Sequence, residues 1–234
     1  EPETILAHVG RLLEHGGALG GKRVLVSAGP TREALDPVRF ISNRSSGRMG
    51  VALAAASWRR GAQVTLVHGP LAVRGPVGAE LVRVESTEEM RQAIADRLPD
   101  ADVLVMAAAP ADFRPSTVAE NKIKKGNAVD SMELAPTPDI LLSTRSARKP
   151  GSIAVGFALE TTDLIANAQD KLARKGLDLV VLNDAREAGA GFDTKTNRVT
   201  LVGQNGQLTE LPLMSKDDVA DAILDRIEEL ASGR

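Results

Sequence analysis

Apolar runs and amphipathic segments alternate along most of this chain. The apolar runs predict buried strands at residues 23–29, 63–69, 80–84, 102–109, 152–159 and 177–183. The spacing of apolar positions between them predicts helices at residues 47–61, 86–98, 137–147 and 163–176. Because the predicted strands are apolar at nearly every position, as parallel strands covered on both faces are, the pattern predicts a doubly wound α/β sheet.

The two ends of the chain depart from this rhythm. Residues 1–20 predict a short helix whose apolar side is formed by Ile5, Leu6, Val9, Leu12 and Leu13. This segment fits a linker from something upstream and an ordinary N-terminal helix equally well. Near the other end, Asn205-Gly206 lies between two alternating runs in residues 197–213 and predicts a β-hairpin. A last helix is predicted from about residue 215 to 230.

Composition excludes several kinds of site. The 234 residues are 43% hydrophobic, which is enough for one sizeable core, and the net charge of −2 gives no basic field for nucleic acid. The absence of cysteine excludes disulfides and thiolate chemistry, and three scattered histidines make a catalytic triad or a zinc site hard to build. Without a signal peptide pattern or an apolar run near the roughly 20 residues of a membrane span, we expect a cytoplasmic protein that does not enter the membrane.

Polar and glycine-rich residues gather where the predicted parallel strands end. The first strand is followed by "GPTREALDPVRFISNRSSGRMG", the strand ending at Ala109 by "PADFRP" and "NKIKK", and the last two by "ET" and "ND". In a doubly wound sheet, ligands bind beyond the carboxyl ends of the strands. The sequence therefore predicts one binding site at this edge.

The start of the first helix of the sheet has the composition of an anion site. It is preceded and opened by Ser45, Ser46, Gly47 and Gly50, and Gly29 lies in the turn after the first strand. Backbone N–H groups at a helix start, with small side chains around them, can bind phosphate. The alternative is an ordinary N-cap with packing glycines, and Gly29 tips the balance toward phosphate.

Two common nucleotide sites are disfavoured. The strand at 63–69 ends in "LVHGP", without the acidic residue that binds the ribose in dinucleotide folds. The 17 residues between Gly29 and Gly47 are also too many for the tight glycine turn, and no GxxxxGK[ST] motif occurs. An NAD-dependent oxidoreductase and a P-loop enzyme are therefore disfavoured.

The segment 110–131 lacks periodicity and carries a lysine cluster, Lys122, Lys124 and Lys125. Such a cluster fits either a solvated surface or a loop that closes on a polyphosphate. From the residues alone, the sequence predicts an α/β enzyme that handles a nucleotide polyphosphate with lysines and Mg²⁺. A kinase, a nucleotidyl transferase and a ligase all remain open at this point.

Five motifs, in order, resemble those of the phosphopantothenate–cysteine ligases. They are "AGPTREALDPVRFISNRSSGRMG", "AAAPADFRP…NKIKK", "PTPDIL", "GFALET" and "LDLVVLND", and the resemblance covers about residues 20–230. The most similar members are the ligase halves of bacterial bifunctional coenzyme A biosynthesis proteins, which also carry a phosphopantothenoylcysteine decarboxylase. The resemblance implies a linker at residues 1–20 and, at 21–234, a Rossmann-like ligase domain that includes the predicted hairpin.

The resemblance also implies a reaction in two steps. The carboxylate of 4′-phosphopantothenate attacks the α-phosphate of CTP, which gives an acyl-cytidylate and pyrophosphate. The amine of L-cysteine then displaces CMP and forms the amide. The preference for CTP over ATP, the use of Mg²⁺ and a homodimer are implied by the resemblance alone. A non-catalytic nucleotide-binding regulatory module is the alternative function.

Individual residues receive roles from the same resemblance. Asn43 is implied to bind phosphopantothenate and process the acyl-nucleotide, Lys122 to act on the nucleotide during activation, and Arg39 to reach the substrate phosphate across a dimer interface. The implied triphosphate cradle is Gly29, Ser45, Gly47 and Gly50. The implied lining of the substrate and nucleotide sites is Ala108, Ala109 and Asp112. The implied nucleotide pocket is Pro138, Asp139, Ile140, Leu141, Phe157, Lys171 and Lys175.

Three of these residues have an ordinary structural interpretation without the resemblance, and one neighbouring position differs from the family pattern. Asp112 could equally cap a turn, and Lys171 and Lys175, four residues apart on one helix face, are typical of surface charge. The family pattern "AAVAD" is "AAPAD" here, with Pro110. Because proline has no backbone N–H, this position cannot donate a hydrogen bond to a ligand.

Overall fold

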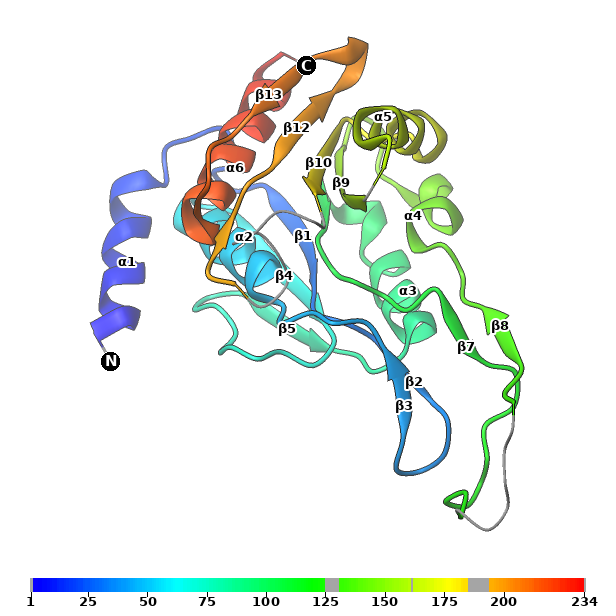
Figure 1. The fold of residues 1–234 in the computed structure, drawn as a ribbon. Coiled ribbons are helices and arrows are strands. Elements are labelled where there is room, and N and C mark those ends of the chain that lie inside the picture. The colour runs from blue at the N-terminus through cyan, green and yellow to red at the C-terminus, as the bar shows by residue number, and fades with distance from the viewer. Residues whose placement is uncertain (1, 125–130, 161, 185–193, 234) are drawn as a thin grey trace.

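The centre of the molecule is an eight-stranded sheet. In the computed structural model, which describes residues 2–124, 131–160, 162–184 and 194–233, most of it is formed by the parallel strands β1 (Arg23–Ala28), β4 (Gln63–His68), β5 (Glu80–Arg83), β6 (Val103–Met106), β9 (Ile153–Glu160) and β10 (Leu179–Asp184). Antiparallel strands β12 (Thr200–Gly203) and β13 (Leu208–Glu210) extend one edge. The order is β13-β12-β10-β9-β6-β1-β4-β5 (Figure 1). Among the parallel strands this is the doubly wound order 3-2-1-4-5-6, so the predicted fold class is confirmed.

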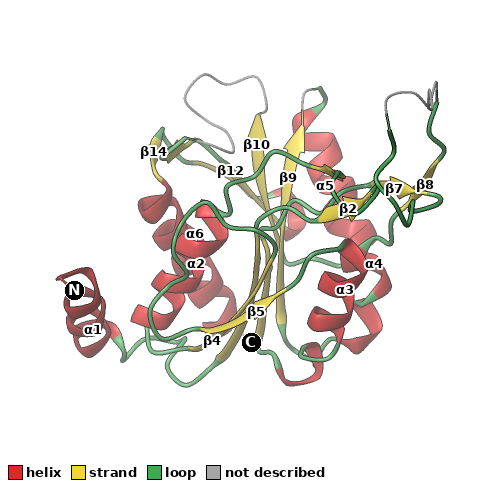
Figure 2. Cartoon of the chain, turned by 90° about the horizontal axis from the view of Figure 1, so that it is seen from below, coloured by secondary structure: helices red, strands yellow, loops and turns green. Residues whose placement is uncertain are grey.

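Helices cover both faces of this sheet (Figure 2). One face is covered by α2 (Arg48–Arg59) and α6 (Lys216–Ser232), and the other by α3 (Thr87–Ala95), α4 (Ile140–Ser143) and α5 (Leu164–Lys175). Successive residues of β1 divide between the two cores: Val24 and Val26 pack on the α2 side, and Leu25 on the α3 side. Because both cores must be apolar, the central strands read as continuous apolar runs.

Side-chain caps begin two of the helices where the sequence predicted them. The hydroxyl of Ser86 accepts from the backbone N–H of Glu89 at 3.2 Å at the start of α3. The Glu89 carboxylate accepts from the N–H of Glu85 at 2.7 Å, one residue earlier than a standard capping box. Ser215 caps α6 in the same way, through the N–H of Asp218 at 3.1 Å.

The helix predicted at 137–147 is shorter than expected. Regular α-helix covers only Ile140–Ser143, and a 3₁₀ turn follows at Arg145–Ala147. The N-cap is Asp139, whose side chain accepts from the N–H of Leu142 at 3.1 Å, rather than the Thr-Pro pair before it.

Two short hairpins lie in segments that the sequence left without secondary structure. The first pairs β2 (Arg32–Ala34) with β3 (Phe40–Ser42), and the second pairs β7 (Phe113–Pro115) with β8 (Leu134–Pro136). Strand β2 contacts β7, so the two hairpins lie side by side at one end of the sheet (Figure 1). Three-residue strands are too short to show a two-residue period, which is why the sequence pattern missed them.

The predicted C-terminal hairpin is confirmed, with a longer turn than a two-residue hairpin has. Asn205-Gly206 lies in a 3₁₀ turn between β12 and β13, and the N–H of Gly203 donates to the carbonyl of Gln207 at 2.8 Å. A further short pair, β11 (Thr196–Asn197) with β14 (Met214–Ser215), leads into α6.

Helix α1 (Pro2–Glu14) forms as predicted, but its apolar side does not face the core. Its attachment runs through Arg11, whose guanidinium lies 4.7 Å from the Trp58 ring and donates to the carbonyl of Gly61 at 3.2 Å. The apolar side remains 45% to 80% exposed, at Ile5, Leu6, Val9, Leu12 and Leu13. None of the helices described in the structure is long and apolar enough to cross a membrane.

Candidate functional site

A cavity of about 550 Å³ lies at the carboxyl ends of the parallel strands. Its walls come from residues 43–49 before and at the start of α2, residues 107–109 after β6, residues 157–159 of β9 and Asn183 of β10. The strand order reverses between β1 and β6, so the cavity opens beside the switch point where doubly wound sheets bind ligands. A second cavity of about 230 Å³ adjoins it.

Most of the residues singled out from the sequence line these two cavities. The larger one is lined by Asn43, Ser45, Gly47, Ala108, Ala109, Asp112, Phe157 and Lys171. The smaller one is lined by Ala108, Asp112, Pro138, Asp139, Ile140, Leu141, Phe157, Lys171 and Lys175. Four residues line both cavities, namely Ala108, Asp112, Phe157 and Lys171. The two cavities therefore form one continuous candidate site.

The start of α2 provides backbone donors at the edge of the larger cavity. Its N-cap is Gly47, in the left-handed conformation with φ of 75°, and no side chain caps the helix. A Cβ on Gly47 would lie 2.3 Å from Cδ2 of Leu71, so only glycine fits here without rearrangement. The first turn also contains no acidic residue. The positive end of the helix is thus left for an anion.

Gly29 and Gly50 lie outside both linings and act through packing. A Cβ on Gly50 would lie 2.5 Å from Cβ of Ala28, which means that glycine lets α2 approach β1 closely. A Cβ on Gly29 would lie 2.8 Å from the carbonyl oxygen of Pro70. Both glycines thus let the helix start lie against the strand end, and their contact with a phosphate stays a prediction.

Asn43 joins the two chain segments that meet at the switch point. Its Nδ2 donates to the carbonyl oxygen of Pro110 at 2.9 Å, which connects the end of the β2–β3 hairpin to the segment after β6. Pro110, which cannot donate from its backbone, thus contributes an acceptor. The Asn43 side chain is exposed on the cavity wall.

The two lysines of α5 are not ordinary surface charges. The ammonium of Lys171 donates to the carbonyl oxygen of Phe157 at 2.5 Å, and burial lowers the pKa of this amine, with a further contribution from the nearby Lys175. Lys175 lies 2.8 Å from the carboxylate of Asp139 and is 13% exposed. Burial acts to raise the pKa of Asp139, but the hydrogen bond from Lys175, the backbone N–H of Leu142 and the nearby positive charges together outweigh it, so that pKa is lowered.

The lowered pKa of Lys171 predicts a pH dependence of nucleotide binding. Because the protonated amine attracts a polyphosphate and the neutral amine does not, the affinity of the cavity for a polyphosphate such as CTP is expected to fall as the pH rises through this lowered pKa. Isothermal titration calorimetry over a pH series from neutral pH up to the ordinary pKa of lysine measures this fall. The variant Lys171→Arg stays protonated throughout and should flatten the curve. A wild-type affinity that is constant over this range would contradict the prediction.

The free energy of unfolding is expected to rise over the same pH range in which the affinity falls. The unfolded chain binds a proton at Lys171 more tightly than the folded chain, because the folded-state pKa is lowered. Burial of the charge therefore decreases the free energy of unfolding below the lowered pKa. This contribution disappears as the pH rises from the lowered pKa to the ordinary value for lysine.

Three residues on the cavity wall were not singled out from the sequence. Asn183 accepts through Oδ1 from Nδ2 of Asn197 at 2.7 Å, and Asn197 and Lys216 are only 5% and 6% exposed. Asn183 stands in the "ND" at the end of the last parallel strand, where its position was a signal. Asn197 and Lys216 come from the C-terminal extension, and neither lies in a motif. Arg44 and Arg48, which look like surface charge, also line the cavity.

Arg39 and Lys122 lie outside both cavities. Arg39 pairs with Asp36, and Lys122 is exposed on the segment between β7 and β8, which extends away from the body of the sheet (Figure 1). Lys124 is exposed on the same segment, and Lys125 lies outside the described residues. Arg39, Lys122 and Lys124 are therefore not part of the two linings in a single chain, and their roles stay predictions.

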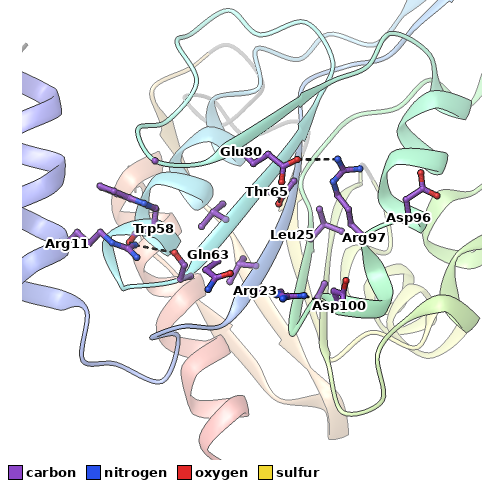
Figure 3. Close-up of a pocket in the computed structure, with 15 residues that line it drawn as sticks. Arg11, Arg23, Leu25, Trp58, Gln63, Thr65, Glu80, Asp96, Arg97 and Asp100 are labelled. Carbon is purple, nitrogen blue, oxygen red and sulfur yellow. Dashed lines mark hydrogen bonds and ion pairs between the residues drawn. The ribbon is translucent and has the colours of Figure 1, made fainter.

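A further cavity, of about 580 Å³, lies at the amino ends of β1, β4 and β5. Four of its charged side chains form two ion pairs (Figure 3): Arg23 with Asp100 at 3.2 Å and Arg97 with Glu80 at 3.3 Å. Arg11 donates to backbone carbonyls there. These ion pairs neutralise their charges in place. The open helix start lies at the carboxyl-end cavity instead, and we therefore assign the functional site to that cavity.

No group of three metal-ligating side chains occurs within the part of the chain that the structure describes. The carboxylate of Asp112 lines both cavities. One carboxylate fits Mg²⁺ that arrives with a nucleotide, since this ion keeps several waters and takes its other ligands from phosphates.

Comparison with known proteins supports one family. Residues 19–230 match the profile of the family described as "DNA/pantothenate metabolism flavoprotein C-terminal domain". The Coenzyme A biosynthesis bifunctional protein CoaBC of Bacillus subtilis (strain 168) is 45% identical over 234 residues, which are 99% of this chain and 57% of that protein. The chain thus spans a little over half the length of this relative.

Solved structures agree with the fold. The crystal structure of the C-terminal domain of a CoaBC protein is 38% identical, with a TM-score of 0.80, and the match covers 94% of this chain and 100% of that one. A Cab2 mutant in complex with phosphopantothenate-cysteine has a TM-score of 0.74 at 18% identity, over 99% of this chain and 94% of that one. At that identity, the likeness concerns the fold alone.

Proposed function

Because the chain belongs to the family of DNA/pantothenate metabolism flavoprotein C-terminal domains, we propose that it is a phosphopantothenate–cysteine ligase of coenzyme A biosynthesis. The family resemblance drawn from the five sequence motifs is confirmed by this membership. The observation that carries the proposal is the cavity at the switch point. An uncapped helix start, Asn43 and the half-buried Lys171 line this one cavity.

The chemistry explains why such a cavity suffices. A carboxylate is a poor acyl donor, and a phosphate ester makes it a good one. In the first step a carboxylate oxygen of 4′-phosphopantothenate bonds to the α-phosphorus of CTP, and the bond to pyrophosphate breaks. In the second step the amine of L-cysteine bonds to the acyl carbon, the bond to CMP breaks, and the amine loses a proton. Positioning and charge neutralisation are the main requirements.

The proposed division of labour follows the two cavities. The smaller cavity, with Pro138–Leu141, takes the nucleoside, and its backbone groups would read the base. The larger cavity takes the triphosphate on the N–H groups around Gly47 and the acyl group beside Asn43. Lys171, which lines both, would lie at the phosphate that joins them.

Mg²⁺ is part of the proposal, bound to the triphosphate and to Asp112. When bound, it would supply charge neutralisation for the departing pyrophosphate. The residues of the chain then orient the nucleotide: the N–H groups of α2 bind non-bridging oxygens, and Lys171 adds a fixed positive charge.

The domain organisation, the oligomeric state and the cellular location are also proposals. The relatives named CoaBC are bifunctional, so we propose that a phosphopantothenoylcysteine decarboxylase domain precedes this one in the native chain. We further propose a cytoplasmic homodimer, in which Arg39 of one subunit serves the site of the other. The support is the family resemblance together with the position of Arg39 outside its own cavity.

Pyrophosphate release tests the proposal. With Mg²⁺ and CTP, adding 4′-phosphopantothenate is expected to start pyrophosphate release, and adding L-cysteine should convert the acyl-cytidylate to product and CMP. A coupled phosphate assay and mass spectrometry measure both steps. A non-catalytic nucleotide-binding module would bind CTP and release nothing. The same assay with ATP in place of CTP decides the nucleotide preference.

A further inference from the structure

The carboxylate of Asp36 connects two separate segments of the chain. Its side chain is fully buried in the turn of the β2–β3 hairpin, where Oδ1 accepts from the backbone N–H groups of Val38 and Arg39, each at 2.8 Å. Its Oδ2 accepts from Nε of Arg39 at 3.0 Å and from the N–H of Ile123 at 3.2 Å. Ile123 belongs to the distant segment between β7 and β8, so one carboxylate holds both segments.

Arg39 binds the carbonyl group of Ile123, the residue whose N–H donates to Asp36. Its guanidinium, bound to Asp36, donates to the carbonyl oxygen of Ile123 at 2.9 Å. Ile123 is therefore held through its N–H by Asp36 and through its C=O by Arg39. A third bond, from the N–H of Ala119 to the carbonyl of Leu35 at 3.0 Å, ties the start of this segment to the same hairpin.

The ionised state of Asp36 is strongly favoured. The hydrogen bond from the Arg39 side chain is the largest cause, and backbone donors including Ile123 add to it, so that the pKa of Asp36 lies far below its usual range. At neutral pH the carboxylate is an acceptor only, and its oxygens receive donors from both segments. The link therefore does not depend on proton exchange under ordinary conditions.

The residues held in this way lie next to the lysine cluster. Lys122 and Lys124 flank Ile123, and both side chains are exposed. Because the backbone of Ile123 is held in place, the positions from which the Lys122 and Lys124 side chains extend are also fixed. A lysine whose backbone is anchored loses less conformational entropy when it meets a phosphate than one on a free segment.

We propose that Asp36 is a positioning residue, which sets the place of Lys122 for the activation step by holding Ile123 against the β2–β3 hairpin. This inference rests on the proposed ligase function and on the activating role that the family resemblance implies for Lys122, and it deepens both. It also assigns a second task to Arg39, which lies on the same carboxylate: any phosphate that draws the Arg39 guanidinium away would pull on the segment that carries Lys122.

A double-mutant cycle tests the proposal. The rate of the first step is measured as CTP-dependent pyrophosphate release in the wild type, Asp36→Asn, Lys122→Gln and the double variant. If Asp36 acts through Lys122, Asp36→Asn is expected to slow the wild type about tenfold and to change the Lys122→Gln rate less than about twofold. Equal factors in both backgrounds would show a merely structural role and overturn the inference.

Two further variants keep the result interpretable. Asp100→Asn removes an exposed carboxylate that pairs with Arg23, far from the hairpin, and is expected to leave the rate unchanged. Ile123→Pro removes the N–H that reaches Asp36, restricts the backbone at Lys122 and residue 123, and leaves the Asp36–Arg39 pair in place. It should lose at least as much rate as Asp36→Asn, even if Asp36→Asn proves unstable in thermal unfolding, and an unchanged rate in Ile123→Pro would refute the inference. Absence of pyrophosphate release in the wild type would instead contradict the proposed function.

Discussion

Replacing Asn43 with aspartate is expected to stop amide formation, lower product formation by at least about 100-fold and leave an acyl-cytidylate behind. Nδ2 of Asn43 donates to the carbonyl oxygen of Pro110 at 2.9 Å. An aspartate carboxylate cannot donate and would be repelled by the partial negative charge of that oxygen, so the side chain would leave its place. It would also bring a negative charge to a cavity that we propose for two phosphorylated ligands. The acyl group would then lose its orientation toward the incoming amine.

The first step should survive in part, because the helix start at Gly47 and the ammonium of Lys171 remain. Mass spectrometry of quenched reactions measures the acyl-cytidylate, and a decrease in CTP shows whether activation continues. The variant Asn43→Ala separates the two causes, since it removes the amide without adding charge. Product formation at the wild-type rate in Asn43→Asp would refute the assigned role.

Replacing Lys122 with glutamine is expected to block the first step, with a loss of about 10³-fold in pyrophosphate release. A positive charge near the transferring phosphorus stabilises the charge that develops on the departing pyrophosphate, and glutamine cannot supply it. In the structure Lys122 is exposed and lies outside the cavity lining, so the loss would show that the reacting complex brings it in.

The neighbouring Lys124 provides the matched control. It is exposed on the same segment and carries the same charge, so Lys124→Gln changes the net charge equally. A small effect in Lys124→Gln beside a large one in Lys122→Gln would establish position, rather than total charge, as the cause. Equal burst amplitudes of pyrophosphate in Lys122→Gln and the wild type would contradict the prediction.

The sheet could be predicted from the sequence because its central strands are covered on both faces. Val24, Leu25 and Val26 belong to two different cores, so no polar position interrupts the run. The edge at which the site lies also followed, since parallel strands present all their carboxyl ends together. The gathering of Asn43, Ala108 and Phe157 around one cavity is a consequence of that topology.

Other features depended on contacts that a single sequence does not show. Lys171 has the spacing of a surface lysine, and only the approach of α5 to β9 places its ammonium on the carbonyl of Phe157. Asn197 and Lys216 come from the extension that folds back over the last parallel strand, and the motif pattern ends before them. Residue type and spacing carried no information about either.

The orientation of α1 shows a limit of periodicity. Its spacing correctly identifies an apolar side, but it does not state which side faces the body of the protein. Here Arg11 attaches the helix through the Trp58 ring and backbone carbonyls, so the polar side is the one that packs. A guanidinium that satisfies several carbonyls can decide such an orientation against the hydrophobic pattern.

The lining of the larger cavity reaches from Asn43, near the start of the sheet, to Lys216, at the first turn of the last helix. No fragment shorter than residues 43–216 contains it. During synthesis a nascent chain therefore acquires a complete site only after Lys216 has left the ribosome. The closure of these long-range contacts also makes ligand binding a measure of global folding, since any species that lacks the docked C-terminal helix lacks one wall of the cavity.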